Sequence, residues 1–189
     1  MNFGAIFLVY SLLSVFGFVV AVYLTYMLDS FLNGHDLPTS RKARKLIKKI
    51  IEEHNPGAKN LYDLGCSRGE FAIGMKYLLP RVDIIGIDTS ALRILFARVA
   101  SFLWRKKVVF RRANIFDEDL TYADVVYTYL WYDRMPPLEK KLLQELKSGA
   151  IVITNTSHFL TWQPVGVYAT HPASKWLSPE FENLFVYKK

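Results

Sequence analysis

The sequence predicts an α/β fold in which a mostly parallel, doubly wound sheet follows one transmembrane helix. Two observations predict it. Residues 3–28 contain no charged side chain. From residue 60 onward, short apolar stretches alternate with helical stretches of about 10–15 residues, a pattern typical of a parallel sheet with helices on both faces. The 189 residues are enough for one such domain and a short appendage.

Residues 1–32 are predicted to be a transmembrane anchor. A helix over the 26 uncharged residues 3–28 would be about 39 Å long, enough to cross a hydrocarbon core of about 30 Å. A secretory signal peptide is the alternative. No Lys or Arg precedes the apolar stretch, it is longer than the core of a signal peptide, and no small-residue cleavage motif follows it. The pattern therefore favours a retained anchor.

The charge distribution predicts the orientation of this anchor. All 24 Lys and Arg, but only 15 of the 17 acidic residues, lie after residue 40, which gives that part a formal charge of +9. Six of the basic residues fall within 41–49. Basic residues near one end of a membrane helix mark the cytoplasmic side, so we expect the N-terminus outside and the domain in the cytoplasm, or on the matrix side of an organelle. An anionic lipid surface is the favoured partner of this charge, and nucleic acid is a less favoured one.

Residues 33–54 are predicted to form a linker and then a basic amphipathic helix that lies against the domain. Ser40 can cap the helix over 41–54, in which the apolar side chains share one face. The chain has one Cys and four His. One Cys excludes an internal disulfide, and the His residues lack the spacing of metal ligands, so no metal site is expected.

Residues 55–189 are predicted to form the α/β domain. Its expected elements are strand 60–64, helix 69–79, strand 82–88, helix 90–104, strands 107–113 and 123–130, helix 136–147 and strand 149–155. No long helix is expected after the last of these. Two short strands, 165–169 and 183–187, are predicted to close the sheet as an antiparallel hairpin. The order of elements indicates a Rossmann-like domain.

The loop after the first predicted strand is the segment that is most informative about function. It reads Asp-Leu-Gly-Cys-Ser-Arg-Gly over 63–69. Ligands of open parallel sheets bind at the carboxyl ends of the strands, where glycines allow close backbone approach and helix-start amides hold polar groups. Asp88 ends the second strand, where a carboxylate can accept both hydroxyls of an adenosine ribose. Cys66 is interpreted as a small loop filler, because no base lies beside it in sequence.

The spacing does not match the nicotinamide fingerprint G-x-G-x-x-G or a P-loop. Asp-x-Gly-x-x-x-Gly with a downstream acid resembles the class I methyltransferases, whose cofactor is S-adenosylmethionine. That resemblance implies that the loop wraps the methionine part and that the first acid lies near its amino group. Ser67 stands where the family usually has Gly. The expected cofactor-binding residues are Asp63, Gly65, Cys66, Ser67, Gly69, Asp88, Thr89, Asn114 and Ile115.

A closer resemblance extends over most of the chain. It rests on the apolar N-terminal helix, the D-L-P-T-S segment at 36–40, the stretch M-P-P-L-E-K-K-L-L-Q-E-L-K-S-G-A-I-V-I at 135–153, the loop W-Q-P-V-G at 162–166 and the terminal L-F-V-Y-K-K. Together these resemble the membrane-anchored protein-lysine methyltransferases of the ATP synthase c-subunit and the adenine nucleotide translocator, with their prokaryotic relatives. The resemblance implies a lysine acceptor, which no motif here indicates independently.

The acceptor is expected at the rim after the fourth strand, near 127–133. This segment lacks the [DN]-P-P-[YF] motif of enzymes that methylate amide or base nitrogens. Its aromatic rings could attract an ammonium group by cation–π contact, or they could simply pack under the next helix. The candidates for the acceptor pocket are Tyr129, Trp131, Tyr132, Trp162 and Pro164. Asp133 is a candidate for assisting proton removal, although alignment of the reactants alone can lower the barrier by about 7–11 kcal/mol.

Two other functions stay open at this point. One is methylation of RNA or of a small or lipid-like molecule. The basic clusters at 105–107 and 111–112 allow RNA, but no base-stacking module accompanies them. The other is a membrane-tethered module that binds S-adenosylmethionine without turnover. The sequence carries no signal of an oligomeric state.

Overall fold

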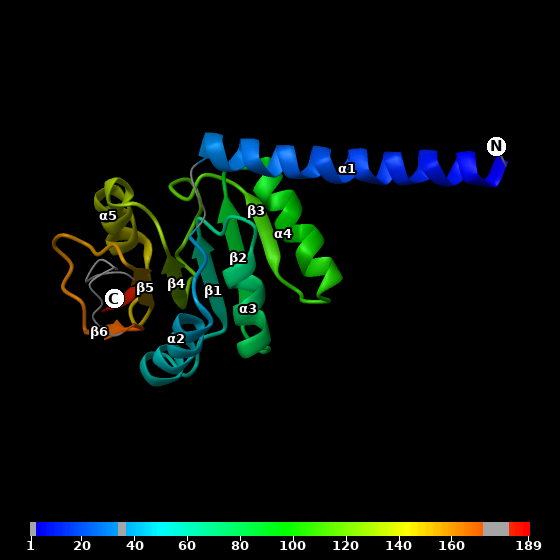
Figure 1. Ribbon diagram of the computed structural model, residues 1–189. Helices are drawn as coiled ribbons and strands as arrows, with labels where there is room; N and C mark the ends of the chain where they lie inside the picture. Colours follow the sequence, from blue (N-terminus) through cyan, green and yellow to red (C-terminus); the bar gives the residue numbers. More distant parts are fainter. Residues whose placement is uncertain (1–2, 34–36, 172–181) are drawn as a thin grey trace. The chain divides into compact units, whose positions relative to one another are not determined.

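The computed structural model describes residues 3–33, 37–171 and 182–189 (Figure 1). The chain divides into two compact units, Met1–Asp36 and Leu37–Lys189. The first is formed by helix α1 (Phe3–Asn33). In the described part of the chain, this helix is long and apolar enough to cross a membrane: within Phe3–Phe31, a window of 18 residues has a mean hydropathy of 2.5.

The second unit is built on a mixed sheet. Within the described residues it has seven strands in the order β3-β2-β1-β4-β5-β7-β6. The strands are β1 (Asn60–Leu64), β2 (Asp83–Asp88), β3 (Val109–Arg112), β4 (Val125–Thr128), β5 (Ile151–Asn155), β6 (Gly166–Ala169) and β7 (Asn183–Lys188). The first five are parallel, and β7 is antiparallel to both β5 and β6. The predicted Rossmann-like sheet with a closing antiparallel hairpin is confirmed. The second strand of the hairpin, β7, lies between β5 and β6, so β6 is at the edge of the sheet.

Helices cover the two faces of this sheet unequally. The helices α2 (Arg41–His54), α3 (Glu70–Leu78) and α4 (Ala91–Leu103) share one core with strand residues such as Leu61 and Val125. Helix α5 (Met135–Glu145) shares the other core with their neighbours Tyr62 and Val126. Successive strand side chains point to opposite faces, so the two cores lie on the two sides of the sheet.

Helix α2 begins where the sequence predicts. The Ser40 hydroxyl accepts a hydrogen bond from the Ala43 N–H at 3.1 Å, which caps the helix. Its apolar side chains Ile47, Ile50 and Ile51 are buried in the core on the α3 side. The helix therefore packs with the domain, while the division into 1–32, 33–54 and 55–189 stays a prediction.

After β5 the chain forms a loop where a doubly wound sheet often has another helix. The buried Glu139 of α5 holds this loop. Its carboxylate accepts hydrogen bonds from the N–H groups of Leu160 (3.1 Å), Thr161 (2.9 Å) and Trp162, and from the Thr161 hydroxyl (2.6 Å). One carboxylate thus satisfies backbone donors that a helix would otherwise satisfy internally.

Candidate active site

The loop 65–69 lies directly at the carboxyl ends of β1 and β2. The two strands are parallel, with Asp63 opposite Gly86. The N–H groups of Gly65 and Cys66 both donate to the Ile87 carbonyl at 2.9 Å, and the Gly69 N–H donates to the Cys66 carbonyl at 2.8 Å. The loop therefore turns tightly over this edge before α3 begins.

The two glycines of the loop have the positive φ that glycine tolerates best. Gly65 has φ +81° and Gly69 has φ +78°. A Cβ at Gly69 would lie 2.5 Å from Phe110 Cζ, and one at Gly65 would lie 2.7 Å from Leu130 Cδ2. Ser67 also adopts a positive φ of 47°, a conformation that costs a non-glycine residue about 1–3 kcal/mol.

Two carboxylates converge on this loop. Asp88 accepts hydrogen bonds from the Ser67 N–H at 3.0 Å and the Ser90 N–H at 2.9 Å. Asp63 is buried, and its Oδ2 has no hydrogen-bond partner. Burial, and then the charge of Asp88, hold the pKa of Asp63 well above its usual range. Gly65 and Asp88 therefore lie at the same edge of the sheet, with a carboxyl oxygen of Asp63 that lacks a hydrogen-bond partner beside them.

Cys66 is a packing residue of the loop. Its side chain is buried, and its Sγ would lie 2.9 Å from a Cβ placed on Gly86. Burial, and then the charges of Asp63 and Asp88, raise the pKa of the Cys66 thiol. The thiol is therefore protonated at neutral pH, which argues against a nucleophilic role.

The remaining predicted cofactor residues follow β2 and β3 at the same edge, since Asp88 pairs with Arg112. Thr89 is exposed, and its carbonyl accepts from Arg112 Nε at 3.2 Å. Asn114 is exposed and its side-chain oxygen accepts from the Phe116 N–H at 3.2 Å, while Ile115 is buried. The nine predicted residues thus follow the ends of three adjacent strands.

These groups fit S-adenosylmethionine. The unpartnered Asp63 oxygen can accept a hydrogen bond of the kind that an ammonium group donates. Each Asp88 oxygen accepts one backbone N–H and keeps a lone pair for a ribose hydroxyl.

The edge formed by β4 and β5 is covered by the segment that leads into α2. The Tyr127 hydroxyl is hydrogen-bonded to the Thr39 hydroxyl at 2.6 Å and accepts from Asn155 Nδ2 at 3.1 Å. The Ser40 N–H donates to the buried carboxylate of Glu182 at 2.5 Å. We call residues 37–40 the strap. Sequence reasoning missed Thr39, Asn155 and Glu182; the only signal was the polar Asn155 at the end of an apolar strand.

The predicted acceptor residues do not form one group. Tyr129 is half-buried and Tyr132 donates to the Thr156 carbonyl at 3.1 Å. Burial raises the pKa of Tyr129, and a hydrogen bond with Thr156 opposes the shift. Both tyrosines therefore form a hydrogen bond with Thr156. Trp131 is 66% exposed beside them.

Trp162 and Pro164 lie elsewhere. The Trp162 ring packs on the α5 side of the sheet, with centroids 5.7 Å from Phe159 and 5.4 Å from Tyr187, and Pro164 follows in the same loop. Asp133 is exposed, and its carboxylate lies 3.2 Å from Arg134 Nε. The structure therefore brings Tyr129 and Tyr132 together and separates Trp162 from them.

Comparison with known proteins shows a match to a family model. The ANTKMT methyltransferase domain matches residues 63–166, which is more than half of the chain. A tRNA (guanine-N(7)-)-methyltransferase of Bacteroides fragilis (strain YCH46) is 28% identical over 102 residues, 53% of this chain and 39% of that protein. A carboxy-S-adenosyl-L-methionine synthase of Campylobacter hominis is 23% identical over 125 residues, 64% of this chain and 53% of that protein. The chain thus spans about half or less of the length of these curated relatives.

Solved structures agree on the fold. An RNA methyltransferase from Salinibacter ruber in complex with S-adenosyl-L-homocysteine superposes with a TM-score of 0.65 at 20% identity, covering 80% of this chain and 93% of that one. An S-adenosylmethionine-dependent methyltransferase from Clostridium acetobutylicum gives 0.54 at 17% identity, covering 72% and 57%. S-adenosylmethionine is the cofactor indicated by the loop, the fold and the family together. The chain belongs to the ANTKMT methyltransferase domain family, within the class I S-adenosylmethionine-dependent methyltransferases.

Proposed function

We propose that this chain is a membrane-anchored enzyme that transfers the methyl group of S-adenosylmethionine to the side-chain nitrogen of a lysine in a membrane protein. The observation that carries the enzymatic part is the convergence of Asp63 and Asp88 on the loop 65–69. The lysine acceptor is supported by the resemblance in sequence, and the membrane by the apolar helix α1 and the basic residues that follow it.

In this proposal each part of the site has one task. Asp63 holds the ammonium group of the cofactor, Asp88 holds the ribose hydroxyls, and Thr89, Asn114 and Ile115 border the adenine. The backbone of the loop, including Cys66 and Ser67, lies against the methionine part. When bound, the cofactor supplies an electrophilic methyl group on a sulfonium.

The acceptor side has to deliver a neutral amine. Lysine has an ordinary pKa of about 10.4, so it must lose a proton before it attacks. The rings of Tyr129 and Tyr132 attract the incoming ammonium group by cation–π contact, and exclusion of water beside them favours the neutral form. Alignment of the amine with the methyl group then contributes the largest part of the rate, without a dedicated base.

The proposal includes an orientation. The N-terminus lies outside and the domain lies on the cytoplasmic or matrix side, because the six basic residues within 41–49 follow the anchor directly. Methylation of RNA is the second candidate. It is favoured by the 28% identity to a tRNA methyltransferase and by the formal charge of +7 on the chain.

Radiolabelled cofactor tests these alternatives. Membranes that contain the full chain are incubated with methyl-labelled S-adenosylmethionine and treated with protease or nuclease, or extracted with organic solvent. We expect protease-sensitive label that comigrates with methyl-lysine after hydrolysis. Label removed by nuclease would establish the RNA alternative, and label in the solvent phase would establish a lipid-like acceptor.

Two variants of β2 test the site itself. Asp88→Ala is expected to weaken cofactor binding in calorimetry by at least about tenfold, which corresponds to 1.4 kcal/mol. Asp83→Ala, at the other end of the same strand with a side chain 87% exposed, is the matched control and should bind normally. Equal binding by both variants would refute the ribose assignment. Normal binding without transfer to any fraction would favour a non-catalytic module.

A further inference from the structure

We infer that the outer face of α4 docks on an anionic membrane surface, in addition to the anchoring by α1 that the proposed function includes. This face carries a ridge of apolar side chains. They are Leu95 (56% exposed), Val99 (46%), Phe102 (80%) and Leu103 (70%). Their spacing of four, three and one residues places them on one side of the helix, opposite the buried Ile94 and Ala97.

Such a ridge is unusual on a surface that faces only water. Contiguous exposed apolar side chains mark contact sites for proteins or membranes. A helix with an apolar outer face and cations beside it is typical of segments that lie in the plane of a lipid interface. The identity of the partner therefore depends on the charges around the ridge.

Those charges are positive. Arg105, Lys106 and Lys107 follow the ridge without an intervening acid. Trp104, 71% exposed, lies between the ridge and these cations in sequence, and Lys106 Nζ lies 4.6 Å from the ring centre of Tyr77, which is 70% exposed. Trp and Tyr concentrate at the head-group level of membranes, where lysine and arginine attract anionic lipids.

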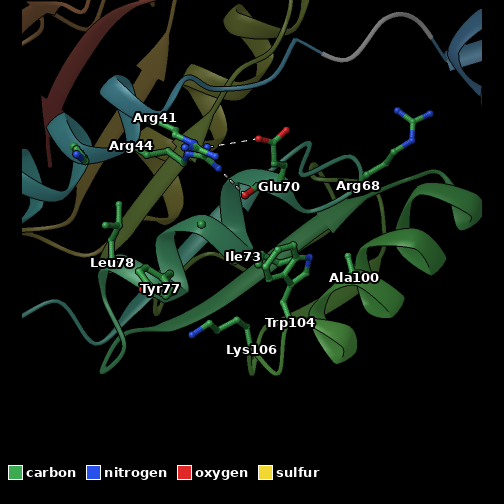
Figure 2. Close-up of a pocket in the computed structure, with 12 residues that line it drawn as sticks. Arg41, Arg44, Arg68, Glu70, Ile73, Tyr77, Leu78, Ala100, Trp104 and Lys106 are labelled. Carbon is green, nitrogen blue, oxygen red and sulfur yellow. Dashed lines mark hydrogen bonds and ion pairs between the residues drawn. The ribbon is translucent and has the colours of Figure 1, made fainter.

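A basic groove continues this surface between α2, α3 and α4 (Figure 2). Its volume is about 780 Å³. Among the described residues, its charged lining is Arg41, Arg44, Lys45, Arg68, Lys106 and Glu70. Five of these residues are cations and one is an acid, Glu70, whose carboxylate lies 3.5 Å from Arg44, so the lining carries an excess of positive charge. None of the predicted cofactor residues lines it.

A membrane fits this surface better than a second copy of the chain. A symmetric dimer through the ridge would place the cations of both copies in one interface, and residues 91–107 contain no acid to offset them, which is repulsive. The tether also favours the membrane. Only seven residues separate the end of α1 at Asn33 from the start of α2 at Arg41, a reach of at most about 25 Å.

Tryptophan quenching in nanodiscs tests the docking. The full chain is inserted into discs of phosphatidylcholine brominated on the acyl chains, with or without phosphatidylglycerol. In the anionic discs we expect Trp104→Phe to remove most of the quenched fluorescence. Trp131→Phe is the matched control, because Trp131 is 66% exposed on the rim after β4, and it should leave the quenched fraction unchanged.

Charge and ridge variants complete the test. High salt, neutral discs and Phe102→Glu should each reduce the Trp104 quenching, whereas Val167→Glu, at a 55% exposed position on β6, should not. Quenching that is equal in neutral and anionic discs, or that is unchanged by Phe102→Glu, would overturn the proposal. Loss of the quenched fluorescence on Trp131→Phe rather than on Trp104→Phe would overturn it as well. A chain found outside the discs would instead show that α1 does not anchor it.

Discussion

The carboxyl group of Asp63 is buried and leaves one oxygen without a partner. Burial and the nearby Asp88 raise its pKa. Charged groups in such positions destabilise the free protein and occur mainly where a ligand completes the site. If Asp63 binds the cofactor as proposed, it links the stability of the domain to cofactor binding through a single side chain.

Asp63→Asn is expected to stabilise the free protein and to abolish tight cofactor binding. An acid whose folded pKa is raised loses stability as pH rises from its ordinary value, about 3.9, towards the folded value. As pH rises through this window, the thermal midpoint of the wild type should therefore fall relative to that of the variant. At neutral pH the two midpoints should differ by about 2–4 °C for each kcal/mol by which their free energies of unfolding differ. Melting curves and calorimetry from pH 4 to 8 measure both effects. Parallel pH profiles of the two proteins would contradict the assignment.

Within α5, Glu139 determines the path of a separate segment of the chain. Burial alone would raise its pKa, but the hydrogen bonds from Thr161, Trp162 and Leu160 outweigh burial and lower it. A lowered carboxylate pKa contributes stability above the ordinary value of about 4.3, and this contribution is lost as pH falls through the folded pKa.

Glu139→Gln should therefore lower the free energy of unfolding at pH 7 by about 1–3 kcal/mol, because charge-assisted hydrogen bonds are replaced by weaker ones. The difference from wild type should shrink in acid. Urea unfolding at pH 7 and at pH 4 checks this. Glu52→Gln, on the exposed side of α2 with Lys48 as its ion-pair partner at 3.5 Å, should change stability by less than about 0.5 kcal/mol.

The elements that the sequence predicted correctly are those with local signals. The cap at Ser40, the apolar face of α2 and the loop 63–69 each follow from residues close together in the chain. The role of Glu139 was not predictable, because its hydrogen-bond partners lie 21–23 residues later in the chain. From the sequence alone it resembles any other charged residue of an amphipathic helix. The position of β7 between β5 and β6 was not predictable either, since both orders of an antiparallel hairpin have the same pattern.

At the scale of the molecule, the asymmetry of charge leads to a topology prediction. A reporter enzyme that works only in the cytoplasm or matrix should be active when it is fused after Lys189. The reason is that basic residues next to a membrane helix resist translocation. Replacing the six basic residues within 41–49 by Gln should weaken this preference. A periplasmic-type reporter that is active after Lys189 in the unaltered chain would reverse the proposed orientation.

The strap carries a consequence for the choice of substrate. Thr39 and Ser40 are fastened to the β4–β5 edge through Tyr127 and Glu182. The five residues 34–38 separate this fastening from the end of α1, a span of at most about 20 Å. For an enzyme anchored in this way, the short tether limits the distance between the domain and the bilayer. If the acceptor is a lysine, as proposed, lysines close to the bilayer surface come within reach, whatever sequence surrounds them.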